Sequence, residues 1–145
     1  MKTTDLVELW IEDSKLDKTK IDHELIRIPE LHSKYYNIFM QERLMMHKYQ
    51  AEYKQLYKLK FEYYNGTISQ EDLEEKGWQP FALKILKTDI PMYMDADPDL
   101  QSIQDKIAIQ KEKVDFVDSI IKSLTNRGFQ LKSAVDFMKF QHGVN

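Results

Sequence analysis

The chain has 145 residues, no cysteine and a formal net charge of −3 at pH 7. The lack of cysteine excludes disulfide bonds, thiolate metal sites and cysteine nucleophiles, and it is typical of a reducing compartment. A net acidic chain is not an indiscriminate nucleic-acid binder, so any anion-binding surface has to be a local patch. The length predicts a single domain, residues 1–145.

The N-terminal residues, MKTTDLVELWIEDS, lack the apolar core and the small-residue cleavage site of a signal peptide. No stretch of the sequence approaches the roughly 20 apolar residues of a membrane-spanning helix. We therefore expect a protein of the cytoplasm that has no membrane partner.

The first predicted element is a long helix over residues 17–64, either continuous or divided into a kinked pair at Pro29. Asn65 and Gly66 end it, because glycine supplies a left-handed cap. Its seam residues alternate spacings of four and three, which is a heptad stripe. The stripe consists of Ile21, Leu25, Ile28, His32, Tyr35, Phe39, Glu42, Met46, Tyr49, Tyr53, Leu56, Lys60 and Tyr63.

Residues 65–97 are predicted to form an irregular acidic connector. Ser69 begins a short helix within it that Gly77 ends, while the stretches FALKIL and IPMYM suggest a small β-hairpin or an extended arm. The run Asp95, Asp97 and Asp99 invites a calcium interpretation, but it lacks the glycine and the glutamate of an EF-hand loop. Helix capping by Asp97 is the favoured explanation.

A second group of helices is predicted over residues 98–140, beginning at Pro98. A heptad stripe from Ile103 to Leu124 is followed by Asn126-Arg127-Gly128, which closes the helix, and by a short terminal helix. Two heptad helices favour helix-on-helix assembly, most economically between subunits. The expected oligomer interface consists of Tyr49, Tyr53, Leu56, Ile107, Val114, Val117 and Ile121.

Charge is segregated along the chain, with net positive segments over residues 34–64 and 101–145 and net negative segments elsewhere. On a helical wheel, Arg43, Lys54 and Lys58 fall on one exposed stripe with Phe61 beside it. Lys60 falls instead on an aromatic face that a neighbouring helix is expected to cover, together with Tyr49, Tyr53, Tyr57 and Tyr64. Cations neutralise phosphates and aromatic faces stack on bases, although lysines beside tyrosines are also typical of a solvated rim.

The sequence contains no recognisable catalytic or cofactor-binding motif. Its four glycines are scattered, which excludes a P-loop and a dinucleotide fingerprint, and its four histidines share no metal-ligand spacing. We therefore expect no enzyme activity, no cofactor and no metal. The catalytic alternative is a metal-dependent nuclease that uses Asp95, Asp97 and Asp99.

Several stretches of the sequence resemble those of a known protein family in spacing and chemistry. The sequence KLKFEYYNG, residues 58–66, resembles the core motif of the UvsY recombination mediators of tailed phages, and the resemblance extends to residues 16–21, 33–37 and 127–132. In that family the lysine and the arginine of the motif are associated with DNA binding, and they match Lys58 and Lys60. Lysine in place of arginine loses the planar, bidentate fork.

This resemblance implies a ring-like homo-oligomer that binds single-stranded DNA and helps the phage recombinase to replace the phage single-strand-binding protein, in the cytoplasm of the host cell. The expected fold is mainly α, with long heptad-bearing helices joined by a less regular middle segment. The expected DNA-binding residues are Lys58, Lys60, Lys54, Arg43 and Phe61. The alternative is a non-catalytic coiled-coil adaptor protein that does not bind DNA.

Overall fold

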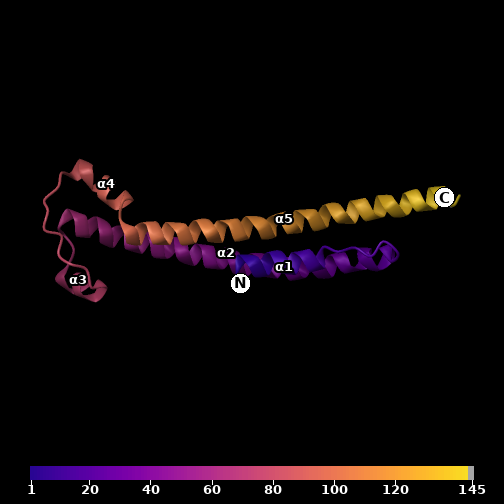
Figure 1. Ribbon diagram of the computed structural model, residues 1–145, viewed down its shortest axis with the longest axis horizontal. Coiled ribbons are helices and arrows are strands. Elements are labelled where there is room, and N and C mark those ends of the chain that lie inside the picture. Colours follow the sequence, from indigo (N-terminus) through magenta and orange to yellow (C-terminus); the bar gives the residue numbers. More distant parts are fainter. Residues whose placement is uncertain (144–145) are drawn as a thin grey trace. The chain divides into compact units, whose positions relative to one another are not determined.

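The computed structural model describes residues 1–143, in which every regular element is helical. The helices are α1 (Thr3–Asp13), α2 (Ile21–Asn65), α3 (Gln70–Lys76), α4 (Ile90–Asp95) and α5 (Pro98–Gln141), with a short 3₁₀ turn, η1 (Lys87–Asp89), before α4 (Figure 1). The prediction of a mainly α fold is confirmed. Within the same residues, no helix combines the length and the apolar composition needed to cross a bilayer.

Helix α2 is one continuous helix that contains Pro29 in its interior. It begins at Ile21, four residues later than predicted, because Asp17 accepts hydrogen bonds from the backbone and the hydroxyl of Thr19 and so stabilises a turn. It ends at Asn65, and Gly66 follows with a φ of 79°. That left-handed conformation is the predicted glycine cap.

Of the two connector stretches for which the sequence suggested a hairpin or an extended arm, one is helical, and the other, residues 81–86, has no regular secondary structure. Ser69 accepts a hydrogen bond from the backbone N–H of Asp72 and Gly77 adopts a φ of 69°, so the predicted short helix is confirmed as α3. The predicted hairpin is wrong, since residues 90–95 form α4 and no strand occurs in the part of the chain that the structure describes. Ile90 and Met94 are one helical turn apart and both are buried, as the spacing of a helix allows.

Helix α5 runs without a break from Pro98 to Gln141, so the predicted stop at Asn126-Arg127-Gly128 is wrong. Gly128 does not take a positive φ. A Cβ added there would lie 3.9 Å from the Cδ1 atom of Ile28 in α2. Glycine in a helix costs about 1 kcal/mol relative to alanine, so α5 continues through this position despite a weak helix former.

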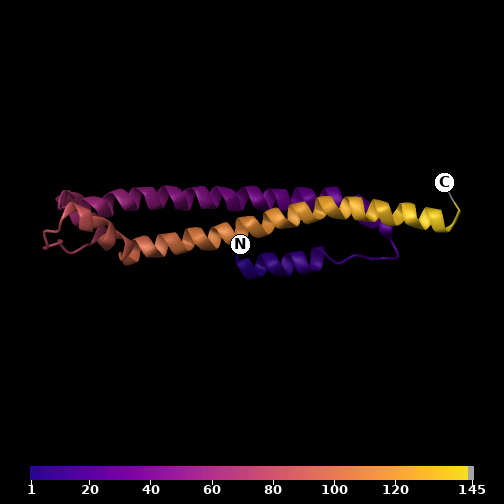
Figure 2. The same ribbon diagram turned by 90° about the horizontal axis from the view of Figure 1, so that it is seen from above.

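The described residues divide into two compact units, and α2 and α5 contribute a segment to each. Unit 1 contains Met1–Leu44 together with Lys111 and the residues after it. In this unit α1 lies beside segments of α2 and α5 (Figures 1 and 2). Its core is formed by buried side chains from all three helices, namely Leu6, Leu31, Tyr35, Val117, Ile120 and Leu124.

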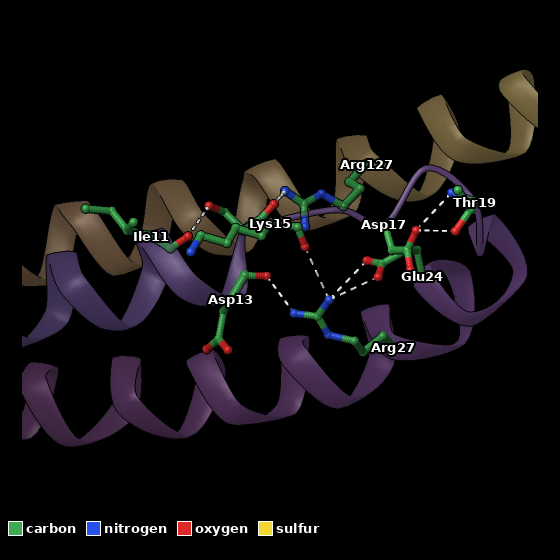
Figure 3. A network of polar contacts seen from close by, with 9 residues as sticks. Ile11, Asp13, Lys15, Asp17, Thr19, Glu24, Arg27 and Arg127 are labelled. Carbon is green, nitrogen blue, oxygen red and sulfur yellow. Dashed lines mark hydrogen bonds and ion pairs between the residues drawn. The ribbon is translucent and has the colours of Figure 1, made fainter.

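Two arginines tie the end of α1 to the other helices of unit 1 (Figure 3). Arg27 donates to the carbonyl oxygen of Asp13 at 2.7 Å and pairs with Glu24 at 3.0 Å. Arg127 donates to the carbonyl oxygen of Ser14 at 2.9 Å, and its guanidinium lies 5.5 Å from the ring centre of Trp10. These carbonyls lie at a helix end, where intrahelical partners run out. Arg127 is therefore a structural residue.

Unit 2 comprises Met45–Gln110, which includes the connector. Within it α2 and α5 run antiparallel, since Tyr49 contacts Lys106 and the earlier end of α5 contacts the later end of α2. The core of unit 2 is smaller and consists of Ile90, Met94 and Leu100, against which Tyr53, Leu56, Tyr64 and Ile85 pack.

Candidate nucleic-acid interface

The exposed face of α2 in unit 2 carries two of the predicted DNA-binding lysines. The side chain of Lys58 is 79% exposed, and its Nζ lies 3.9 Å from Glu62 Oε1, the outer limit of an ion pair. Lys54, one turn earlier, is exposed and makes no ion pair with any residue that the structure describes. Both ammonium groups can therefore reach a ligand from solvent.

Aromatic rings are interleaved with these lysines. Phe61 is 43% exposed and lies three residues after Lys58, while Tyr57 is 46% exposed and lies three residues after Lys54. Residues three and four apart are neighbours on a helix surface, so the four side chains form one mixed face. Sequence reasoning identified Phe61 and missed Tyr57, which it assigned to the covered aromatic side.

Arg43 belongs to unit 1 and is also exposed. Its guanidinium lies 6.0 Å from the ring centre of Phe39. No ion pair holds it among the residues that the structure describes, so its fixed charge is available for an anion.

Lys60 lies on the opposite side of α2 and is only 4% exposed. Its Nζ lies 3.1 Å from Asp97 Oδ2 and 2.8 Å from Asp99 Oδ2, and 3.8 Å from the ring centre of Trp78. The expectation that Lys60 contacts DNA therefore needs correction, because the chain's own carboxylates and indole ring already surround its ammonium group. Within the chain, the start of α5 and Trp78 cover this ammonium group.

Asp97 is the centre of this cluster and is the predicted N-cap of α5. Its Oδ1 accepts hydrogen bonds from the backbone N–H groups of Asp99 and Leu100, and its Oδ2 accepts one from the Tyr64 hydroxyl at 2.6 Å. Burial by itself raises the pKa of Asp97, but these hydrogen bonds and the ammonium of Lys60 outweigh it and lower the pKa. Burial and the Asp97 carboxylate raise the pKa of Tyr64. The lowered pKa favours the ionised carboxylate of Asp97 beside the Lys60 ammonium group.

The same geometry bears on the metal-dependent nuclease alternative. Two of its three carboxylates, Asp97 and Asp99, point at the ammonium group of Lys60. Within residues 1–143 no group of three or more potential ligands could hold a metal ion. The cation that these aspartates bind is therefore a side chain of the protein.

The predicted interface residues of α5 lie on a seam within the chain. Val114 is 7% exposed and Val117 is fully buried in unit 1, while Ile121 packs against the same core. Val117 therefore packs within its own chain, and a subunit interface at these residues stays a prediction. The half-buried Ile107 lies in unit 2.

The predicted interface residues of α2 occupy the equivalent seam in unit 2. Tyr53 and Leu56 pack against the core of this unit, and the Tyr53 hydroxyl accepts a hydrogen bond from Gln104 at 3.2 Å. Tyr49 is half-buried, with the ammonium of Lys106 lying 6.0 Å from its ring centre. A heptad pattern cannot distinguish a partner helix in the same chain from one in another subunit, since both bury the same stripe.

Two other polar residues of the predicted heptad stripe on α2, Glu42 and His32, lie in different surroundings. Glu42 is buried and pairs with Lys113 at 3.5 Å and with the N-terminal amine at 3.6 Å, so it is a pairing residue within unit 1. His32 is exposed and stacks on Tyr36 instead of facing the seam.

Comparison with known proteins extends over nearly all of the chain. Residues 9–144 match the sequence family described as "Recombination, repair and ssDNA binding protein UvsY", a description that names binding and no reaction. The recombination protein uvsY of Enterobacteria phage T4 is 23% identical over 143 residues, which is 99% of each protein.

Crystal structures of the bacteriophage T4 recombination mediator protein UvsY have the same fold. The lattice type II structure superposes with a TM-score of 0.81 and covers 98% of both chains, at 22% identity. The lattice type IV structure gives a TM-score of 0.84 and covers 97% of this chain and 99% of the other, also at 22% identity. Because the family match spans most of the sequence, the chain belongs to the UvsY family of recombination, repair and single-stranded-DNA-binding proteins.

Proposed function

We propose that this protein is a recombination mediator without catalytic activity, which binds single-stranded DNA as a ring-like homo-oligomer. It helps to load the phage recombinase onto DNA covered by the phage single-strand-binding protein, in homologous recombination, repair and recombination-dependent replication in the host cytoplasm. Family membership supports the DNA and recombination parts of this proposal. The two partner proteins follow from the resemblance of the core motif.

The DNA-contacting residues in this proposal are Lys54, Lys58 and Phe61 on the mixed face of α2 and Arg43 in unit 1. The observation that carries it is the contrast within the core motif, where Lys58 is 79% exposed and Lys60 is buried. An exposed ammonium at the outer limit of an ion pair, 3.9 Å from Glu62, exchanges that partner for a phosphate more easily than a buried ammonium held by two carboxylates does. Phe61 can stack on any base, so base sequence matters little.

The mechanism is electrostatic and depends on assembly. Each subunit makes a few weak phosphate contacts, and a strand that passes over several subunits adds them, because the second contact is already intramolecular. A duplex bends much less easily, given its persistence length of about 150 base pairs, so single strands are favoured. The bound strand is thereby held bent or wrapped for the recombinase.

The test compares two lysines with matched surroundings. Lys58 and Lys122 are 79% and 75% exposed, and each pairs with an acidic residue one turn away, Glu62 or Asp118. Lys58→Ala is expected to weaken binding of a labelled single strand and to reduce the logarithmic salt slope by about 0.7 for each phosphate that is no longer neutralised. Lys122→Ala is expected to change neither quantity.

Fluorescence anisotropy over a salt series measures both quantities for a single strand and for a duplex. Equal affinity for the two forms, or equal slopes for the two variants, would contradict this placement of the site. If the wild-type protein binds no single strand even at low salt, the coiled-coil adaptor replaces the mediator.

A further inference from the structure

A row of stacked side chains runs along α2 within unit 1. The rings of His32 and Tyr36 are nearly parallel, at an angle of 8° with their centres 6.0 Å apart. Tyr36 contacts Phe39 at 6.1 Å with an angle of 31°, and the guanidinium of Arg43 lies 6.0 Å from the centre of the Phe39 ring. The positions follow the helical spacing of four, three and four residues, so the row stays on one side of the helix.

The row is anchored at its centre and open on its outer side. Phe39 is half-buried and packs against the core of unit 1, to which the buried Tyr35 belongs. Tyr36 remains 46% exposed, and His32 and Arg43 are exposed as well. The packed ring of Phe39 supports its neighbour Tyr36 from one side, and such support reduces the entropy cost of ordering a ring on binding.

A shallow hollow lies beside the exposed part of the row. It is lined by His32 and Tyr36 together with Ser33, Lys34, Asn37 and Met40. Most of this lining can form hydrogen bonds, and Met40 is its one aliphatic member. The Lys34 ammonium is already held by Asp13 at 2.7 Å, so Arg43 is the free cation of this surface among the described residues.

From this arrangement we infer that His32, Tyr36, Phe39 and Arg43 form a base-stacking surface for a single strand of nucleic acid. The inference rests on the proposed function and adds a site in unit 1 to the mixed face of unit 2. One base stacks on the exposed ring of Tyr36, the polar groups of the hollow surround its edge, and Arg43 binds the neighbouring phosphate. A second copy of the chain fits this surface less well, because a subunit seam buries apolar side chains and the hollow presents Ser33 and Asn37.

The experiment separates stacking from charge by means of the strand itself. Binding of an ordinary oligonucleotide is compared with that of an abasic strand of the same length, which keeps the phosphates and lacks the bases. Tyr36→Leu keeps an apolar side chain and removes the π face, whereas Tyr36→Trp keeps a π face. Ile26→Ala is the control, since Ile26 is an exposed apolar residue of α2 in unit 1 that does not line the hollow.

Tyr36→Leu is expected to weaken binding of the ordinary strand by about 5-fold or more, as removal of one stacked base does, and to leave binding of the abasic strand and the salt slope unchanged. Tyr36→Trp and Ile26→Ala are expected to bind the ordinary strand within about 2-fold of wild type, within the usual spread of a surface substitution. Circular dichroism and the mass of the assembly, measured by light scattering, are expected to be the same for all variants.

Three results would overturn the inference: equal weakening on both strands, no weakening on either, or a change in assembly mass with Tyr36→Leu, which would assign the surface to subunit contact. If Lys58→Ala still lowers the salt slope in those cases, the proposed function stands and only the stacking surface is rejected. If the wild-type protein binds neither strand, the proposed function fails as well.

Discussion

Replacing Lys60 with methionine separates a structural role of the core motif from a DNA-binding role. Methionine keeps the unbranched apolar stem but removes the charge that lies 3.1 Å from Asp97 and 2.8 Å from Asp99. Asp97, at 2% exposure, then remains buried without its counter-ion.

The expected loss of stability depends on which interactions Asp97 and Asp99 keep after the lysine charge is removed. Removing one member of a buried ion pair usually costs about 3–5 kcal/mol. Asp97 keeps three hydrogen bonds, from Tyr64 and two backbone N–H groups, and the Asp99 side chain is 55% exposed, so water compensates part of this cost. Removing the ammonium from the face of the Trp78 ring adds about 1 kcal/mol. We expect the free energy of unfolding to fall by about 2–4 kcal/mol in total.

Urea unfolding followed by circular dichroism, at one fixed protein concentration, measures this change. The double variant Lys60→Met with Asp97→Asn is expected to recover part of the stability, because it leaves no unpaired buried charge. At low urea, where Lys60→Met is folded, its DNA salt slope is expected to equal that of wild type. A decrease below about 0.5 kcal/mol, the size of an ordinary surface substitution, or a slope reduced as in Lys58→Ala, would refute the structural role.

Three further predictions concern stability. The pKa of Asp97 is lowered from its ordinary value of 3.8, so the ionised carboxylate stabilises the fold above that pH, and this stabilisation is lost as the pH falls through the lower folded-state pKa. The urea midpoint is therefore expected to fall more steeply with acid in wild type than in Asp97→Asn. Parallel curves of midpoint against pH would contradict this. We expect a loss of stability of about 1 kcal/mol from each of two changes at the ends of α3: Ser69→Ala, which removes its N-cap, and Gly77→Ala, at a φ of 69°. If Gly77→Ala raises the stability instead, the left-handed cap is excluded. Leu124→Ala, in the core of unit 1, is expected to cost about 2–5 kcal/mol in the same assay, whereas a cost below about 1 kcal/mol would place Leu124 outside the core.

Local signals in the sequence were sufficient for the helix boundaries that depend on capping chemistry. Ser69, Gly77 and Asp97 each act through hydrogen bonds or a φ angle within a few residues, which a sequence displays directly. Helix α1 was missed, although Leu6, Leu9 and Trp10 have helical spacing, because eleven residues give too short a pattern to stand out. The predicted break at Gly128 was wrong because glycine permits a left-handed cap without requiring one, and Gly128 has no positive φ.

The candidate site was predictable only in part, and for a comparable reason. A helical wheel separates Lys58 from Lys60 correctly, since it needs only the period of the helix. It does not reveal what covers the far side, and the two aspartates that bind Lys60 lie 37 and 39 positions later in the chain. Ring contacts such as those of Tyr36 also depend on side-chain conformations that no spacing specifies.

Residues of the heptad stripes of α2 and α5 pack within the chain, so subunit contacts have to be sought on other surfaces as well. Tyr53 supports the core of its own unit, so Tyr53→Ser is expected to lower the stability of the chain instead of dividing an assembly. Large apolar side chains remain uncovered on the last turns of α5, where Phe137 is 60% and Phe140 is 79% exposed. Exposed aromatic surface of this kind is typical of an interaction site.

The double variant Phe137→Ser with Phe140→Ser is therefore expected to reduce the assembly mass measured by sedimentation while the far-ultraviolet circular dichroism spectrum is retained. Because multivalent binding depends on linked subunits, its affinity for long single strands should fall much more than its affinity for a strand that spans only one subunit. An unchanged mass would exclude these rings from the subunit contact. A reduced mass with unchanged affinity for long strands would instead remove avidity from the mechanism, since the separate subunits would then hold DNA as tightly as the assembly does.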